Sequence, residues 1–562
     1  MRIGHHHPVN TPTPALVTHQ AARPLPRVAL LLLCAAYVLP GVFGRDPWRQ
    51  EDITAFGYML SLAEGRSDWL TPALGGIPAH AALLPHWLGA VFIKLLSPAI
   101  DPSLAARLPF AALLGLVLAL TWYTTFQLAR TEAAQPVALA FGGEAGTVDY
   151  ARAIADASVL ALIASLGLLQ LGHETTPELA QLFGVGMYLW ALAAAPYRTW
   201  RVRIAALAAL VVVSGSNAPA MALAMGLAGV LVCAFSSYEQ VRAQVPWLAL
   251  ATLTGAAVAW WLGAWAWRVD FSFDLPQLLQ IGRMWLWFMW PAWVLALWTL
   301  WRWRKYLQNR HVSVPLLTVL VALAASIVMG SSERALLLGL PGLAVLAAFA
   351  LPTLNRSTTA AIDWFSMLLF TAGAIAIWVI YLSVQTGVPA KPAANIQRLG
   401  PGFEPTFSAV ALGFALAATC CWLWLLRWRT TRHRAALWKS LVLPASGVAL
   451  CWMLLMTLGL PMLDYARSNR PLVERIATHV PAGECIAAPK QARWLIAALE
   501  FHGNFVVDAV NDAQHTPCRY LLRVETLDRE HRPLEGWTRI ASERRPTERN
   551  SVSAIYRRTA GP

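Results

Sequence analysis

The sequence is poor in charged residues. Asp and Glu supply 30 of its 562 residues and Lys and Arg supply 44, so 13% of the positions carry charge, about half the fraction that a soluble protein needs. Hydrophobic residues make up 57% of the chain, and the mean hydropathy is +0.50. This composition excludes water as the solvent for most of the chain and predicts a membrane protein.

The formal charge of +14 does not indicate a nucleic-acid partner. The Arg residues lie in short loops between apolar runs, and no basic patch falls on a soluble fold. The sequence also lacks a Walker-type Gly-rich loop, a His-Glu-x-x-His helix, a Cys-x-x-Cys pair and a nucleophile elbow. An ATP-driven pump is therefore not predicted.

Cysteines and metal ligands are also few. Five of the seven cysteines lie in or beside apolar runs and are predicted to be small core residues. Cys485 and Cys518 fall near the C-terminus, where an oxidising periplasm would allow them to pair. No metal site is predicted, although two outer carboxylates leave room for a divalent cation.

Apolar runs long enough to cross a bilayer occur throughout the chain. They predict an α-helical polytopic membrane protein with a cytoplasmic tail at 1–27, a transmembrane domain at 28–463 and about thirteen spans. The spans are expected near 28–44, 105–129, 152–171, 179–196, 203–217, 218–236, 246–267, 284–301, 313–330, 334–352, 362–384, 406–427 and 438–460. The division between 203–217 and 218–236, at Gly215–Asn217, is the least defined.

The distribution of Lys and Arg predicts the orientation. With the N-terminus in the cytoplasm, the loops after the even-numbered spans carry most of the basic residues, as in Arg302, Arg304, Lys305 and Arg310. The positive-inside rule is then satisfied by one assignment along the whole chain. An odd number of spans places the C-terminus in the periplasm, and the expected location is a bacterial inner membrane.

Three further regions differ from simple spans. Residues 45–104 are predicted to form a long first periplasmic loop, with interfacial helices at 53–63 and 83–96. Residues 385–405 are rich in Pro and Gly and are predicted to be an outer loop. Residues 464–562 are predicted to be a small periplasmic α/β domain. Its expected strands lie near 485–488, 505–507 and 520–524, and its expected helices near 471–479 and 490–500.

The densest polar cluster follows the first span, in the run Arg45-Asp46-Pro47-Trp48-Arg49-Gln50-Glu51-Asp52. One interpretation is a solvated loop with local ion pairs. The functional interpretation is that a carboxylate, Glu51 or Asp52, deprotonates an acceptor hydroxyl or amine as a general base. Adjacent acids alone do not decide between the two, but the segments that follow them do add information.

Those segments come in a fixed order: Gln50-Glu51-Asp52, Tyr58-Met59-Leu60, Ser67-Asp68-Trp69-Leu70-Thr71-Pro72, Leu74-Gly75-Gly76-Ile77-Pro78, His86-Trp87-Leu88-Gly89-Ala90 and Ala106-Arg107-Leu108-Pro109. This order resembles the first extracytoplasmic loop of the GT-C-type glycosyltransferases that use polyprenyl-phosphate sugars. That group includes the lipid A aminoarabinose transferases and the protein O-mannosyltransferases. The resemblance is strongest over residues 45–130.

The resemblance implies roles for individual residues. Glu51 matches the family's catalytic Asp and Asp52 its second acid, and because a shift of one residue would exchange them, both stay candidates. His173, Glu174 and Glu178 match a second polar motif near the active site. Pro177, between the two glutamates, breaks the expectation that they share one helical face. Arg334 matches a basic residue of the family, and Trp69 a position near the substrate.

Two departures from the family concern lysines. Ala81-Ala82-Leu83-Leu84-Pro85 stands where members have a Lys-Pro-Pro, and Ser214-Gly215-Ser216-Asn217 stands in place of a Lys-Gly. A departing lipid phosphate carries extra negative charge, which a nearby cation stabilises. The candidates that remain for this role, all expected outside, are Arg45, Arg49, Arg268, Arg283, Arg334 and His86.

The resemblance thus implies an integral inner-membrane glycosyltransferase. The donor would be a polyprenyl-phosphate-linked sugar, the acceptor a glycolipid or a protein, and the C-terminal domain would cover the cavity or help to select the acceptor. Two alternatives stay open. One is a lipid or glycan transporter or flippase, disfavoured by the absence of a convincing internal repeat. The other is a catalytically degenerate scaffold, which the missing lysines would favour.

Overall fold

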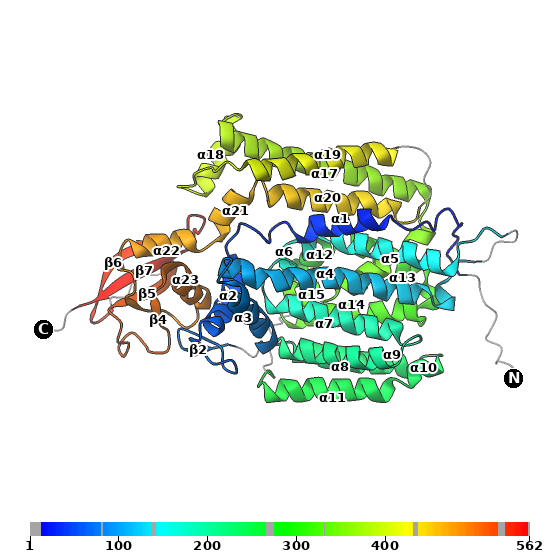
Figure 1. The fold of residues 1–562 in the computed structure, drawn as a ribbon, viewed down its shortest axis with the longest axis horizontal. Helices are drawn as coiled ribbons and strands as arrows, with labels where there is room; N and C mark the ends of the chain where they lie inside the picture. Colours follow the sequence, from blue (N-terminus) through cyan, green and yellow to red (C-terminus); the bar gives the residue numbers. More distant parts are fainter. Residues whose placement is uncertain are drawn as a thin grey trace.

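The computed structural model describes residues 13–79, 82–137, 142–265, 275–330, 332–430, 436–526 and 534–559. Most helices run along one common direction and form a layered bundle, and a small sheet domain caps one end of the bundle (Figure 1). The N-terminal segment that begins at Thr13 lies at the opposite end. The fold is therefore mainly helical with one small mixed domain.

The bundle contains both long helices and short ones. They are α1 (Arg27–Val38), α4 (Pro102–Ala129), α5 (Thr147–Ala164), α6 (Leu166–Leu171), α7 (Pro177–Ala194), α8 (Trp200–Gly215), α9 (Pro219–Ala234), α10 (Glu239–Arg242), α11 (Val245–Trp261), α12 (Leu275–Phe288), α13 (Ala292–Arg302), α14 (Arg310–Val328), α15 (Glu333–Leu337), α16 (Leu340–Ala348), α17 (Arg356–Thr386), α18 (Ala390–Leu399), α19 (Ala409–Thr430) and α20 (Lys439–Leu455). Short 3₁₀ turns follow at η1 (Glu132–Ala134), η2 (Arg304–Tyr306) and η3 (Leu351–Thr353).

Every predicted span falls on a helix or on a broken pair of helices. The uncertain division at 215–217 is correct, because α8 ends at Gly215, Asn217 adopts a left-handed φ of 69°, and α9 restarts at Pro219. The span expected at 284–301 is instead two helices, α12 and α13, bent by 94°. The end of the span expected at 246–267 lies outside the described residues.

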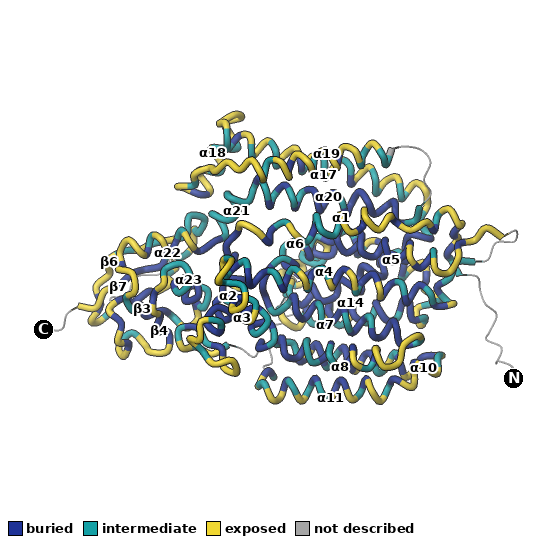
Figure 2. Tube along the Cα trace, viewed as in Figure 1, coloured by how far each residue is buried: buried dark blue, intermediate teal, exposed yellow. Residues whose placement is uncertain are grey.

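Among the described residues, five helices are long and apolar enough to cross a membrane, or up to seven if each of two bent pairs counts as one span. The count of about thirteen therefore stays a prediction, since several of the expected spans are short or broken helices. The outer helices α17 and α19 expose much of their surface (Figure 2), and the side chains exposed on α17 include Trp364, Leu368 and Ile375. Large apolar side chains on a continuous exposed face are typical of contact with lipid.

The segment at 385–405, predicted as a Pro/Gly-rich outer loop, connects α17 to α19 and contains the helix α18. Pro392 lies in the first turn of α18, where the missing backbone N–H costs nothing. The Pro and Gly residues that suggested a loop mark its borders, with Pro389 as the N-cap and Gly400 as the C-cap.

The first loop contains both expected helices. They are α2 (Arg49–Ala63) and α3 (Leu83–Leu96), joined through a hairpin of β1 (Ala73–Leu74) and β2 (Ile77–Pro78). The acids Glu51 and Asp52 lie in the first turn of α2, where negative charge is favourable. The two helices lie at the end of the bundle that faces the sheet domain (Figure 1).

The C-terminal part begins with α21 (Leu460–Arg467) and α22 (Arg470–Ala477) and continues as a five-stranded mixed sheet with α23 (Arg493–Gly503) packed on it. The strand order is β4 (Val506–Asp508), β3 (Cys485–Ala487), β5 (Tyr520–Thr526), β7 (Ser551–Arg558) and β6 (Trp537–Glu543). Strand β3 is parallel to β4 and β5, and β7 is antiparallel to β5 and β6. The three expected strands and both expected helices are present, and a disulfide joins Cys485 to Cys518.

The sheet domain docks tightly on the first loop. Phe56 of α2 meets Phe501 of α23 with ring centroids 4.7 Å apart. Gly57 faces the same helix so closely that a Cβ there would come within 2.7 Å of the Ala497 side chain. The backbone of Gly75 accepts a hydrogen bond from Ala509 N–H at 3.0 Å. The first loop is therefore held between the bundle and the C-terminal domain.

Candidate functional site

Asp52 is a fully engaged buried carboxylate, with 1% of the residue exposed. One oxygen accepts hydrogen bonds from the Thr175 N–H (2.7 Å) and hydroxyl (2.6 Å), and the other from Trp48 N–H (2.9 Å) and Arg45 (3.0 Å). Burial raises the pKa of Asp52, but the charge of Arg45 and these hydrogen bonds outweigh it and bring the pKa below its ordinary value. Such a carboxylate ties the start of α2 to the segment before α7.

Arg45, the partner of Asp52, donates its hydrogen bonds to groups of the protein itself. Its guanidinium donates to the carbonyl oxygens of Gly41 (2.7 Å) and His173 (2.6 Å) in addition to Asp52, and it lies 4.8 Å from the centroid of the Trp48 ring. Its side chain is 2% exposed. The expectation that Arg45 meets a lipid phosphate stays a prediction, and this geometry instead favours a role in holding the first loop on the bundle.

A second cluster forms around Arg334 on α15. Its guanidinium donates to Glu174 (2.9 Å), Glu178 (3.1 Å) and the Thr176 hydroxyl (3.2 Å). The side chains of Arg334 and Glu178 are 21% and 22% exposed. Glu51 is also exposed, and its negative charge contributes to raising the pKa of Arg334. Residues from α2, the segment before α7, α7 itself and α15 thus converge at one end of the bundle.

The two glutamates reach Arg334 in a way that helical spacing did not predict. Pro177 is the first residue of α7, so Glu178 lies in its first turn while Glu174 precedes the helix. The helix is interrupted as expected, and Arg334 rather than a shared face brings the carboxylates together. Burial raises the pKa of Glu174 above its ordinary value despite the charge of Arg334, so Glu174 carries its negative charge less readily than an ordinary carboxyl.

The C-terminal segment completes this end of the bundle. Arg467 of α21 donates to the side-chain oxygen of Gln170 (3.0 Å), and the Gln170 amide donates to Glu174 (3.0 Å). Asp46 of the first loop accepts two hydrogen bonds from Arg470, at 2.8 and 2.6 Å. The start of the sheet domain is thereby linked to the Arg334 cluster and to the first loop.

Two other predicted residues lie apart from this cluster. His86 of α3 is 3% exposed, its ring lies 5.1 Å from the Tyr58 ring, and burial lowers its pKa to about 4. It is therefore neutral and enclosed at neutral pH. Trp69 is 38% exposed, and its carbonyl oxygen accepts a hydrogen bond from the Trp87 indole at 2.6 Å. No contact joins either residue to Arg334 in the part of the chain that the structure describes.

His173 packs at the outer end of α6. Its ring lies 4.7 Å from the Trp452 ring, and burial lowers its pKa to about 4. One ring nitrogen lies 2.9 Å from the Tyr37 carbonyl oxygen and the other 2.7 Å from the Leu169 carbonyl oxygen. A neutral ring donates a hydrogen bond to only one of these two oxygens. Through its contacts with Tyr37 and Trp452, His173 links the end of α6 to α1 and α20.

Of the remaining candidate arginines, only the side chain of Arg283 lies in the described part of the chain. Arg283 is exposed on α12 and makes no hydrogen bond or ion pair with the rest of the described chain. Helix α12 contacts α6 and α15, which carry Gln170 and Arg334. Arg268 lies outside the described residues, as does the side chain of Arg49. Among the described residues, no group of three His, Cys, Asp or Glu side chains is arranged to hold a metal ion.

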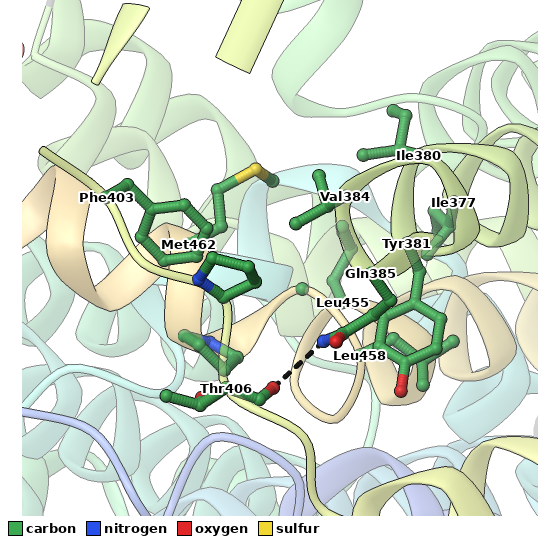
Figure 3. Close-up of a pocket in the computed structure, with 13 residues that line it drawn as sticks. Ile377, Ile380, Tyr381, Val384, Gln385, Phe403, Thr406, Leu455, Leu458 and Met462 are labelled. Atoms are coloured by element: carbon green, nitrogen blue, oxygen red, sulfur yellow. Dashed lines mark hydrogen bonds between the residues drawn. The ribbon is translucent and has the colours of Figure 1, made fainter. Parts of the chain in front are cut away.

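An apolar cavity opens beside this end of the bundle, between α17, the segment at 403–406 and the bend from α20 to α21. Figure 3 shows Ile377, Tyr381 and Leu455 around it, and Gln385 donating to the Thr406 carbonyl oxygen at 3.0 Å. Met462 lines the cavity and is five residues from Arg467 on α21. A helix rises 1.5 Å per residue, so Met462 and Arg467 are about 8 Å apart along the axis of α21.

Several residues of the site did not emerge from the sequence as candidates. Gln170, Thr175 and Thr176 are uncharged, and nothing in their spacing marks them. Arg467 and Arg470 follow the last span closely, in the run Asp464-Tyr465-Ala466-Arg467-Ser468-Asn469-Arg470. That density of charge just after a span is a signal that could have identified them.

Comparison with known proteins shows the fold. No family model matches the sequence, and neither does any curated protein. Two solved structures of ArnT from Cupriavidus metallidurans do resemble the chain: one bound to undecaprenyl phosphate, with a TM-score of 0.59, and one in the apo state, with a TM-score of 0.57. Each is 13% identical and covers 94% of this chain, which in turn covers 96% and 97% of theirs.

ArnT is a lipid A aminoarabinose transferase of the GT-C type. The similarity extends over nearly the whole of both chains, so this protein shares the fold of ArnT, and the resemblance found in residues 45–130 is confirmed at the level of fold. At 13% identity the comparison carries the fold alone.

Proposed function

We propose that this protein is an integral membrane glycosyltransferase that moves a sugar from a polyprenyl-phosphate donor to a glycolipid or protein acceptor. The observation that carries the proposal is the convergence of Glu51, Glu174, Glu178 and Arg334 from separate segments at the end of the bundle facing the sheet domain. Support comes from the ArnT fold, one example of which was solved with undecaprenyl phosphate bound.

Glu51 is the carboxylate that we assign as the general base. Asp52 has four donors on its two oxygens and is buried, so it has no free lone pair directed to a substrate and its pKa is lowered. Glu51 is exposed, one residue earlier in the first turn of α2. We therefore assign a structural role to Asp52 and the reactive role to Glu51.

The reaction assigned to this site is a direct displacement. The acceptor hydroxyl or amine gives its proton to Glu51 while its oxygen or nitrogen bonds to the anomeric carbon. The bond from that carbon to the phosphate oxygen breaks, and polyprenyl phosphate leaves with one additional negative charge. Inversion at the anomeric carbon follows from a single displacement. Cations near the departing phosphate lower the barrier.

Arg334 and Arg283 are the cations that we assign to the phosphate. Arg283 is exposed on a helix that contacts α15 and has no partner among the described residues. Arg334 is shared between two glutamates, so an arriving phosphate must compete with them for its guanidinium. A guanidinium suits this exchange, because its fork of donors binds carboxylates and phosphates in the same geometry.

The apolar cavity beside α17 and α21 supports a lipid-linked substrate. Its walls are mainly aliphatic and aromatic, with polar groups at Gln385 and Thr406. Met462, which lines it, lies about 8 Å along α21 from the residue that contacts Gln170. A section of isoprenoid or acyl chain fits this chemistry, and its polar head would then lie near the Arg334 cluster.

The test is comparative mass spectrometry of envelope glycolipids and glycoproteins. Strains of the source organism that lack the gene, carry it, or carry Arg283→Gln are compared. The matched control is Arg201→Gln, at an exposed arginine in the first turn of α8. We expect one glycosylated species to vanish on deletion, to return with wild type and Arg201→Gln, and to fall at least tenfold with Arg283→Gln. Identical profiles with and without the gene would refute the function.

A further inference from the structure

A second cavity lies at the opposite end of the bundle from the Arg334 cluster. Its walls come from the N-terminal segment at 13–16, from Val137, and from the end of α13 together with η2. It shares no residue with the candidate site. Its lining is divided into a cationic side and an apolar side.

The cationic side consists of Arg302, Arg304 and Lys305. All three are exposed, and none forms an ion pair with another described residue. The guanidinium of Arg304 lies 5.7 Å from the centroid of the Trp301 ring. Three cations within four residues and without a carboxylate partner repel each other, so an anion placed among them is strongly favoured.

The apolar side is held in place by two hydrogen bonds to backbone carbonyl oxygens. Val137 N–H donates to the Ala15 carbonyl oxygen at 3.0 Å, and the Thr13 hydroxyl donates to the Gln135 carbonyl oxygen at 2.9 Å. These bonds hold Pro14 and Leu16 along one wall, where Leu16 is 68% exposed. An exposed leucine on a fixed backbone opposite three cations is an arrangement that suits an amphiphilic ligand.

We propose that this cavity binds an anionic phospholipid. The phosphate lies against Arg302, Arg304 and Lys305, and the glycerol and upper acyl chain lie against Pro14, Leu16 and Val137. Trp301, 54% exposed at the end of α13, marks the level at which aromatic side chains meet lipid head groups. Basic pockets between membrane helices are suited to anionic lipid heads. The apolar wall favours a lipid over a free phosphate, which would leave it unused.

The experiment measures lipid binding to the purified full-length protein in detergent by native mass spectrometry. Phosphatidylglycerol, phosphatidylcholine and soluble glycerol phosphate are titrated against wild type, against a triple variant with Arg302→Gln, Arg304→Gln and Lys305→Gln, and against Leu16→Asn. The control carries Arg198→Gln and Arg201→Gln, two exposed cations of which the first lies between α7 and α8 and the second in the first turn of α8. All of the substituted side chains except that of Leu16 are polar and exposed, so the fold is retained.

We expect wild type to bind phosphatidylglycerol more tightly than phosphatidylcholine. Each cation near a lipid surface contributes about 1 kcal/mol, or about fivefold, so the triple variant should lose more than tenfold in affinity while the control stays within twofold. Leu16→Asn should lower the affinity for phosphatidylglycerol but leave the affinity for glycerol phosphate unchanged. Equal affinity of wild type and triple variant for phosphatidylglycerol would overturn the proposal, and so would glycerol phosphate binding as tightly as the lipid.

Discussion

Replacing Asp52 by Asn tests the division of labour between the two adjacent acids. Asn keeps an oxygen for the Thr175 donors, but its NH₂ group then faces two donors, Trp48 N–H and Arg45. Arg45, with 2% of its side chain exposed, is left as a buried charge without its carboxylate. Breaking a buried ion pair on one side costs about 3–5 kcal/mol.

The effect is best measured locally, because a membrane bundle with a docked domain is not expected to unfold in one step. Hydrogen exchange of the amides of Trp48 and Thr175 reports opening of this contact. A loss of about 3 kcal/mol corresponds to opening about a hundred times more frequent, since 1.4 kcal/mol is a factor of ten. Asp68→Asn, at an exposed position in the same loop, is the control and should leave both amides unchanged.

The dependence on pH follows from the direction of the pKa shift. The folded-state pKa of Asp52 is below the ordinary value of 3.8, so its contribution is fully present above that value and is lost as the pH falls through the lower folded value. Between pH 5 and 8 this pair therefore adds no pH dependence. Unchanged exchange at Trp48 and Thr175 in Asp52→Asn would refute the structural assignment, and Asp52 would again be a candidate base.

Three further outcomes are expected. Arg334→Gln should lower the transfer rate about 10²–10³-fold, as loss of one charge-stabilising donor does, with Arg334→Lys retaining part of the rate; a normal rate in Arg334→Gln would exclude it from the phosphate site. Gly57→Val should loosen the sheet domain, because even a Cβ at this position meets Ala497 at 2.7 Å. Limited proteolysis should then release that domain faster than in Gly115→Val, a helical glycine of α4 where a Cβ would have no atom within 4 Å. Cys518→Ser removes a disulfide that closes a loop of 33 residues and should destabilise the domain by about 3–4 kcal/mol. The amides of β3 and β5 should then exchange faster than in oxidised wild type, and as fast as in wild type treated with a reductant. Equal exchange in oxidised and reduced wild type would contradict this prediction.

Much of the helical layout could be predicted from the sequence, because hydropathy reports directly on which segments leave water. The ends of α8 and α9 and the two helices of the first loop were predicted closely. The bend between α12 and α13 was not, since a run of apolar residues looks the same whether straight or bent. Strands β6 and β7 were missed because their many Arg and Ser residues give no clear alternation of apolar and polar positions.

The candidate site was predictable only in part. The resemblance to the GT-C-type family made Glu51, Asp52 and Arg334 candidates, but their environments depend on contacts between distant segments. Asp52 is engaged by Thr175 and Glu174 by Gln170, and both partners are ordinary polar residues in the sequence. The roles of the adjacent acids could therefore be separated only once the partners of each carboxylate were known.

The measurement that tests the central claim most directly is the transfer activity of Glu51→Gln. Envelope glycolipids and glycoproteins from a deletion strain complemented with Glu51→Gln are compared by mass spectrometry with those of strains carrying wild type or Glu64→Gln, an exposed glutamate at the end of α2. Removing a general base costs typically 10²–10⁴-fold. The account predicts that the glycosylated product is lost with Glu51→Gln and kept with Glu64→Gln at equal protein levels. Full product formation by Glu51→Gln would contradict it.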